Sequence, residues 1–261
     1  MRIIPLSAEH EPLFCACLED WSDEMRKAGD HKAKWLAKMR DRGLRVKLAL
    51  DDNGAVGGMI QYVPIEEAFV DGEGLYFIPC IWVHGHKRGR GNFQKKGMGR
   101  ALLAAAEEDA RELGAKGMAA WGMAIPVFMR ASWFRKHGYK KADAVGMQVL
   151  LWKPFAADAK PPRWVRDKKT PEPVPGRVTV TALVNGWCPG MNTAYERAKR
   201  AAAEFGDRVE FRAVDTFDHA VFKAWGEPDA IFVDGKGLRM GPPPAYAKIR
   251  KAIAKRVKKL G

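Results

Sequence analysis

The residues whose types and spacing are best suited to chemistry form a basic, glycine-containing turn. It reads Gln94-Lys95-Lys96-Gly97-Met98-Gly99-Arg100 and lies between a predicted strand, 75–83, and a predicted helix, 97–113. The first amides of a helix have no partner inside the helix, and the helix dipole favours negative charge there. The two glycines let a ligand approach the backbone closely, and the three cations supply counter-charge. The turn therefore predicts a phosphate-binding site.

Two segments of the chain, taken together, resemble one enzyme family. Gln94-x-x-Gly97-x-Gly99, followed by Arg100-Ala101-Leu102-Leu103, resembles the Q/R-x-x-G-x-G/A coenzyme A motif of GNAT acetyltransferases. Downstream, Trp133-Phe134-Arg135-Lys136-His137-Gly138-Tyr139 is similar to the family's F-Y-x-K-x-G-F segment. In order and spacing the resemblance covers most of residues 1–153. It implies an enzyme that uses acetyl-CoA as co-substrate and transfers the acetyl group to a primary amine by direct attack.

The resemblance also implies which residues contact the cofactor. Besides Gln94 to Arg100, these are the backbone of Ile81 and Val83, which would hold the pantetheine arm and polarise the thioester carbonyl, and Phe134. Pro79 in the same strand predicts a bulge that helps to open the sheet. The sequence departs from the family twice. The connection 84–93, HGHKRGRGNF, is several residues longer than usual, and Phe134 stands where many members have a tyrosine that protonates the leaving thiolate.

The titratable residues near this point are Cys80, His84 and His86. A cysteine in an apolar strand is more typical of a core, and histidines in a Gly/Arg-rich loop are more typical of solvated positions. If one of them acts, His84 is the better candidate for the base that takes the amine proton, and Cys80 could protonate the thiolate. The acids Glu66, Glu67 and Glu73 are alternatives, and the sequence does not rank them.

These residues require an α/β domain over residues 1–153, a mixed sheet with flanking helices. Apolar patterns predict strands at 2–5, 46–50, 57–64, 75–83, 118–123 and 147–152, and helices at 7–19, 21–42, 97–113 and 127–137. Residues 154–176 hold six of the sixteen prolines, which predicts an extended linker. A second, smaller domain is expected over residues 177–261.

The second domain looks like a thioredoxin fold that lacks its first strand and helix. Its predicted order is strand 178–184, helix 191–205, strand 209–214, helix 218–225, strand 231–233, strand near Leu238 and a last helix. Cys188 sits where that family has its first active-site cysteine, and Met191 replaces the second. Pro228 precedes the hairpin strand, where the family has a cis-proline. The two-domain order resembles that of YoaP-type acetyltransferases.

The formal net charge of +14 is concentrated in two places. Residues 84–100 contain six cations and residues 248–261 contain seven, with no acid in either segment. An alternative function is therefore nucleic-acid binding, although no strand interleaves arginine with aromatic residues. A third possibility is a thiol-binding adaptor that uses Cys188 while the first domain is inactive. No apolar run is long enough to span a bilayer, and the four cysteines show no paired metal-ligand spacing. The expectation is a cytoplasmic protein without metal, membrane or nucleic-acid partners; the sequence indicates no oligomeric state.

Overall fold

The computed structural model describes residues 1–260, and its internal contacts divide the chain into two units. The first unit consists of Met1–Trp21 and Leu36–Val165, and the second of Ser22–Trp35 and the chain from Arg166 on. The segment Ser22–Trp35, which the sequence places in the first domain, therefore has its contacts in the second unit. The expected linker limits of 154 and 176 stay predictions. No helix in residues 1–260 is both long and apolar enough to cross a membrane.

The first unit is built on a seven-stranded mixed sheet with the order β1-β2-β3-β4-β5-β7-β6. Neighbouring strands are antiparallel except for the central pair β4 and β5, which is parallel. The strands are β1 (Arg2–Pro5), β2 (Arg45–Leu50), β3 (Val56–Pro64), β4 (Tyr76–Val83), β5 (Gly117–Met123), β6 (Lys140–Val145) and β7 (Gln148–Pro154). The α/β class and mixed sheet expected from the sequence are confirmed.

The helices of this unit follow the apolar spacing of the sequence where that spacing is strong. In α4 (Met98–Glu112), Leu102, Ala106 and Ala110 are fully buried against β2, β3 and β4, as their period of about 3.6 residues predicts. Leu113, expected on the same face, caps the helix and is largely exposed. The other helices that lie wholly or partly in this unit are η1 (Ala8–His10), α1 (Glu11–Cys15), α3 (His31–Arg40), η2 (Ile65–Glu67) and α5 (Ala131–Lys136).

Three expected helices are shorter in the structure. The helix expected over 21–42 breaks at Gly29, whose φ of +73° is left-handed, into α2 (Asp23–Arg26) and α3. The helix expected over 7–19 ends at Cys15, because the next residues include Cys17 and Leu18 with positive φ. The helix expected over 127–137 begins only at Ala131, because residues 124–130 fold back on β5, where the Met123 amide donates to the Met129 carbonyl at 2.7 Å.

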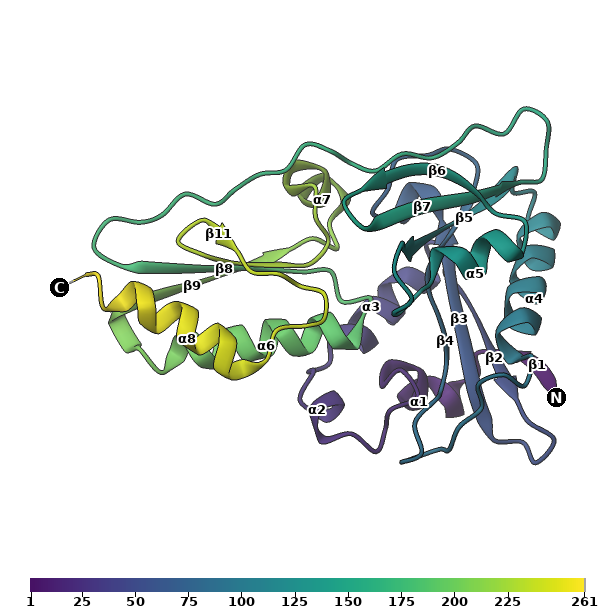
Figure 1. Ribbon diagram of the computed structural model, residues 1–261, viewed down its shortest axis with the longest axis horizontal. Helices are drawn as coiled ribbons and strands as arrows, with labels where there is room; N and C mark the ends of the chain where they lie inside the picture. The colour runs from purple at the N-terminus through teal and green to yellow at the C-terminus, as the bar shows by residue number, and fades with distance from the viewer. Residues whose placement is uncertain (261) are drawn as a thin grey trace. The chain divides into compact units, whose positions relative to one another are not determined.

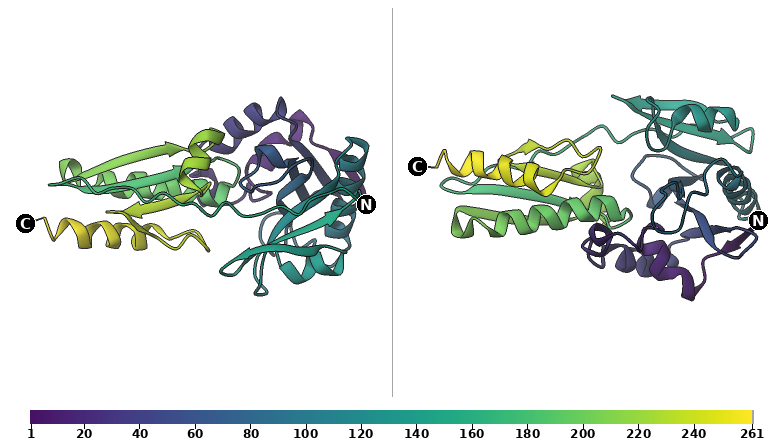
Figure 2. Two further views of the ribbon diagram at one scale, coloured as in Figure 1. Left: turned by 90° about the horizontal axis from the view of Figure 1, so that it is seen from above. Right: turned by 60° about the horizontal axis from the view of Figure 1, so that its bottom comes forward.

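The second unit contains a four-stranded mixed sheet with the order β11-β10-β8-β9. Helices α6 and α8 pack against each other on one face, and α7 lies on the other (Figures 1 and 2). Their shared core includes Val180 of β8, Ala198 of α6 and Ile253 of α8. The elements are β8 (Val178–Val184), α6 (Pro189–Ala203), η3 (Gly206–Arg208), β9 (Val209–Asp215), α7 (His219–Trp225), β10 (Ala230–Val233), β11 (Lys236–Gly237) and α8 (Tyr246–Val257).

One expectation for this unit is wrong. The peptide bond before Pro228 is trans, although a cis bond was expected there. Within residues 1–260 the cis peptide bond joins Gly241 to Pro242, in the segment that leads into α8.

Candidate functional site

The central strands β4 and β5 pair over only three residues and then part (Figure 1). Tyr76 to Ile78 of β4 face Met118 to Ala120 of β5, and no pairing continues beyond them. The next residue of β4 is Pro79, which has no N–H to donate. The β3–β4 register shifts opposite Pro79, between Gln61 and Val63, so the predicted bulge is confirmed. The result is a gap between β4 and β5 in the middle of the sheet.

The backbone of β4 presents polar groups to this gap at every second residue. The Pro79 carbonyl accepts from Trp121 Nε1 of β5 at 2.8 Å, and the Val83 carbonyl accepts from Gln94 Nε2 at 3.4 Å. The His84 amide points the other way, to Gly57 beside β3, at 2.9 Å. Since backbone direction alternates along a strand, the N–H and C=O of Ile81 also face the gap. This supports the predicted binding roles of Ile81 and Val83.

The turn 94–100 lies at the end of β4 and opens α4 with unused donors. Gly97 is the N-cap of α4, and its φ of +84° is left-handed. Within residues 1–260 the backbone amides of residues 96–100 make no hydrogen bond to another backbone group, and no side chain caps the helix. The side chains of Gln94, Lys95, Lys96 and Arg100 are exposed around them. Free amides, a helix dipole and three cations suit a phosphate group.

Buried neighbours hold the turn in place. The Phe93 ring lies so close to Gly57 of β3 that a β-carbon there would be 2.4 Å from it, and the Lys96 amine lies 5.5 Å from the centre of the same ring. Met98 points inward and is buried, so it can serve a ligand only through its backbone. Together the turn and the gap suit an extended ligand that carries phosphate at one end.

His84 is fully buried, and both of its ring nitrogens are engaged. Nδ1 lies 2.6 Å from the Gly91 carbonyl, to which it must donate, and Nε2 accepts from Trp21 Nε1 at 3.1 Å. Because the indole N–H can only donate, His84 is the neutral Nδ1–H tautomer and has no lone pair left for a proton from a substrate. This geometry does not support His84 as the base.

His86 lies two residues further along the loop and is half exposed. Its Nε2 is 3.5 Å from the Glu19 carboxylate, and its ring is near those of Trp21 and Trp82. The Trp82 ring also meets Phe128, which in turn meets Trp121, with centroids 5.9 Å and 6.0 Å apart. Aromatic rings of β4, β5 and the segment 124–130 thus lie next to one another beside the gap.

The two remaining predicted residues, Cys80 and Phe134, are buried. Cys80 of β4 is buried, and it faces away from the α4 side, against which its neighbour Ile81 packs. Phe134 of α5 is also fully buried, between Trp133 and Tyr139. The side chain of α5 nearest the turn is Trp133, whose ring is 3.5 Å from the position of a β-carbon on Gly99. Sequence spacing alone did not show which of the two neighbours, Trp133 or Phe134, lies beside the turn.

A charge cluster, consisting of Asp109, Arg45, Lys47 and Tyr62, fixes α4 on the sheet. The Asp109 carboxylate accepts two bonds of 3.0 Å from Arg45, one of 2.9 Å from Lys47 and one of 2.6 Å from Tyr62. Burial alone would raise the pKa of Asp109, but these hydrogen bonds hold it well below its ordinary value. Burial also raises the pKa of Tyr62. Asp109 therefore stays ionised and Tyr62 keeps its proton, and the cluster ties α4 to β2 and β3.

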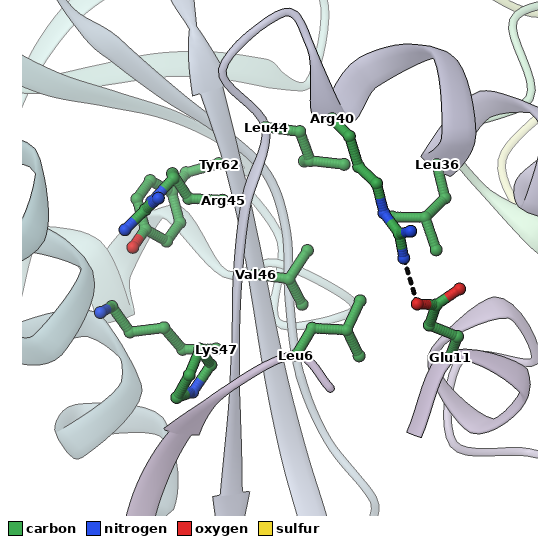
Figure 3. A pocket seen from close by; sticks show the side chains of 10 residues that line it. Leu6, Glu11, Leu36, Arg40, Leu44, Arg45, Val46, Lys47 and Tyr62 are labelled. Carbon is green, nitrogen blue, oxygen red and sulfur yellow. Dashed lines mark hydrogen bonds and ion pairs between the residues drawn. The ribbon is translucent and has the colours of Figure 1, made fainter. Parts of the chain in front are cut away.

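A pocket of about 350 Å³ lies elsewhere in the first unit (Figure 3). It lies along β2 just beyond the last residue of β1, with the Glu11–Arg40 ion pair at its side. It is lined by Pro5, Leu6, Glu11, Leu36, Arg40, Leu44, Arg45, Val46, Lys47 and Tyr62. Because β2 and β4 are separated by β3, this pocket is distinct from the gap.

The sequence was then compared with known proteins. The family model described as acetyltransferase (GNAT) family matches residues 8–139, just over half of the chain. A search of curated protein sequences gives no match.

Several solved structures are similar to this chain. The GNAT family N-acetyltransferase YhbS from Escherichia coli, in complex with CoA, is 19% identical, with a TM-score of 0.43 over 60% of this chain and 82% of that one. A GNAT family acetyltransferase from Brucella melitensis, in complex with acetyl-CoA, is 17% identical, with a TM-score of 0.41 over 61% and 90%. The PaiA N-acetyltransferase from Thermoplasma acidophilum, in complex with coenzyme A, is 19% identical, with a TM-score of 0.43 over 59% and 100%.

Proposed function

Because the chain belongs to the GNAT acetyltransferase family, we propose that it is an N-acyltransferase that transfers acetyl from acetyl-CoA to a primary amine, on a small molecule or at an amino terminus. The observation that carries the proposal is the gap after Ile78 and Ala120, with the free amides of residues 96–100 at its open end. An arm attached to a phosphate at residues 96–100 would then follow β4 into the gap.

The residues of the first unit would divide the work of binding. The amides of residues 96–100, with Lys95, Lys96 and Arg100, would bind the phosphates. The N–H and C=O of Ile81, together with the Val83 backbone, would hold the pantetheine arm as an added strand would be held. Bound acetyl-CoA would supply the activated thioester, and a backbone N–H of β4 would stabilise the negative charge that develops on its oxygen.

Proton transfer needs a different assignment from the one the sequence favours. The bonds of His84 to Gly91 and Trp21 give it a positioning role, because it holds the loop 84–93 that leads to Gln94. Cys80 adjoins Ile81 on β4, and we propose that its thiol gives a proton to the departing thiolate, while the attacking amine releases its proton to water, from which Cys80 is reprotonated. Phe134 would serve by packing, since it has no proton to give.

The proposal is tested by acetyl-CoA binding, measured as the shift in melting temperature. A ligand that binds only the folded state raises this temperature by mass action, so acetyl-CoA should raise it for the wild type. Gly97→Val should abolish the shift, because the side chain would occupy the phosphate turn. Gly114→Val is a matched control at the other end of α4: its φ is +80° against +84° at Gly97, and both glycines have open space where a β-carbon would be.

Both variants should lose stability because both have left-handed backbone, but only Gly97→Val should lose the acetyl-CoA shift. Gly99→Val should also lose it. An undiminished shift in Gly97→Val and Gly99→Val would mean that the cofactor binds elsewhere.

For the second unit we propose a thioredoxin-like domain, in which residues 177–261 follow a linker over 154–176. Support comes from the chain order β8-α6-β9-α7-β10-β11-α8, with β8 and β9 parallel and β10 antiparallel to β8. Cys188 is the N-cap of α6, where helix amides favour a thiolate. Met191, in the first turn of α6, stands where the motif has its second cysteine.

A further inference from the structure

A side chain closes the inner end of the gap between β4 and β5. Trp121 is the first residue of β5 beyond the paired segment, and on its other edge it pairs with Leu150 of β7. Its indole reaches back across the gap and donates to the Pro79 carbonyl at 2.8 Å. The two strands are therefore joined by backbone pairing up to Ile78 and Ala120, and beyond that by the hydrogen bond from Trp121 to Pro79.

The indole is held from a second direction. Its ring centroid lies 6.0 Å from that of Phe128, which lies 5.9 Å from that of Trp82. Moving the indole away would break its hydrogen bond to the Pro79 carbonyl, which lies at the bulge, and would leave that carbonyl without this donor. Trp121 therefore forms a defined end wall of the gap.

The opposite end of the gap is where a ligand would enter. The free amides of residues 96–100 lie there, next to Val83, and from Val83 to Pro79 the strand covers about 13 Å at about 3.3 Å per residue. An arm that follows β4 inward from its phosphates meets open backbone at Ile81 and then the indole at Pro79. The group carried at the tip of that arm must fit in front of the indole.

We propose that Trp121 sets the length of the acyl group that this enzyme accepts, and restricts the donor to acetyl and similarly short acyl-CoA. The inference rests on the proposed function, because it takes the gap as the channel for the pantetheine arm. Each added methylene would press on a rigid ring that is fixed by the Pro79 bond. A longer chain would have to displace the indole and break that bond, which weakens its binding.

The test measures the dissociation constants of acetyl-CoA, butyryl-CoA and hexanoyl-CoA by calorimetry, with no acceptor present. The wild type should bind hexanoyl-CoA about tenfold or more weakly than acetyl-CoA, since misfit in a closed pocket is worth about that factor. Trp121→Ala should remove most of this difference. Trp121→Phe, which keeps a ring but has no N–H for Pro79, should give an intermediate profile. Trp225→Ala, a tryptophan of the second unit, should leave the wild-type profile unchanged.

Equal affinity of the wild type for the three donors would overturn the inference. So would a Trp121→Ala protein that binds acetyl-CoA and keeps the wild-type preference. If Trp121→Ala fails to fold, Trp121→Leu and Trp121→Phe decide in the same way. These results differ from failure of the proposed function, in which the wild type would bind none of the donors and Gly97→Val would change nothing.

Discussion

His84 fixes the loop that leads to Gln94 through hydrogen bonds of its ring and its backbone. Its Nδ1 holds the Gly91 carbonyl, its Nε2 accepts from Trp21, and its own carbonyl accepts from the Phe93 amide at 2.9 Å. These three bonds close the loop 84–93 on itself and on the segment after α1. The loop ends at Gln94, so His84 sets where the phosphate turn begins.

We expect His84→Ala to act on stability. The change removes a fully buried ring and leaves a part-buried indole N–H and a part-buried carbonyl without this partner, which together costs about 2–4 kcal/mol of unfolding free energy. His86→Ala, at a half-exposed position, should change it by less than about 0.5 kcal/mol. The unfolding free energies of both variants are measured by urea unfolding, and their affinities for acetyl-CoA are measured alongside. A His84→Gln protein of wild-type stability and affinity that no longer transfers acetyl would restore His84 as the base.

The turn Gln94 to Arg100 could be predicted from residue types alone. Its glycines leave the start of the helix accessible, and its lysines make it positively charged. The burial of His84 and Phe134 could not be predicted in this way. Both lie in segments whose composition indicates exposure or contact with cofactor, and both are fully buried. Burial depends on partners far away in the sequence, such as Trp21 for His84. Local spacing contains no record of those partners.

At the scale of elements, the position of α4 depends on one buried carboxylate. Asp109 lies near the C-terminal end of α4, whereas the phosphate turn is at its N-terminal end. Its four hydrogen bonds, to Arg45, Lys47 and Tyr62, join the helix to β2 and β3. Because a helix is stiff, a contact that fixes one end also fixes the direction of the other.

We expect Asp109→Ala to lower the unfolding free energy by about 2–4 kcal/mol, since it leaves two neighbouring cations without their carboxylate; Arg45 is half exposed, which moderates the loss. Tyr62→Phe, which removes a single bond to the same carboxylate, should cost about 1 kcal/mol. Urea unfolding at pH 7 separates the two. If both variants lose the same unfolding free energy, the Asp109 carboxylate contributes no more to stability than its single bond from Tyr62.

Elements with a strong, regular pattern could be predicted to within a residue or two, as β2, β3, β4 and α4 show. Pro79 even predicted the bulge that opens the gap. β6 could not be predicted, because Lys140–Val145 is half polar and its pairing depends on β7. The broken helix at Gly29 was missed because apolar spacing continues on both sides of it.

At the scale of the whole molecule, the second unit includes a segment from early in the chain. Arg197 of α6 forms an ion pair with Glu24 of α2, and Glu196 lies 2.8 Å from Nε2 of His31 in α3. These pairs join residues more than 160 positions apart. Local sequence patterns do not predict such distant pairs. The sequence therefore places residues 22–35 in the first domain.

The second unit also contains a carboxyl group whose ionisation opposes folding. Burial raises the pKa of Asp229 from 3.8 to about 6, although bonds from the Asn185 amide at 3.2 Å and Trp187 Nε1 at 2.8 Å act in the other direction. Between these pH values the folded state holds a proton that the unfolded state has released. The stability of this unit should therefore fall as pH rises from about 4 to about 6, and level off above that.

We expect Asp229→Asn to lack this decline, because an amide does not titrate, and so to gain stability relative to the wild type from pH 4 to pH 6 and to keep that gain up to pH 7.5. Calorimetric unfolding of the full chain across this range makes the measurement, read as the difference between the two proteins at each pH. Asp218→Asn, at the exposed N-cap of α7, keeps a good capping residue and should follow the wild type throughout. A wild-type protein that gains stability from pH 4 to pH 6 relative to Asp229→Asn would mean that the bonds from Asn185 and Trp187 outweigh burial. Asp229 would then be an ionised anchor for the segment before Cys188.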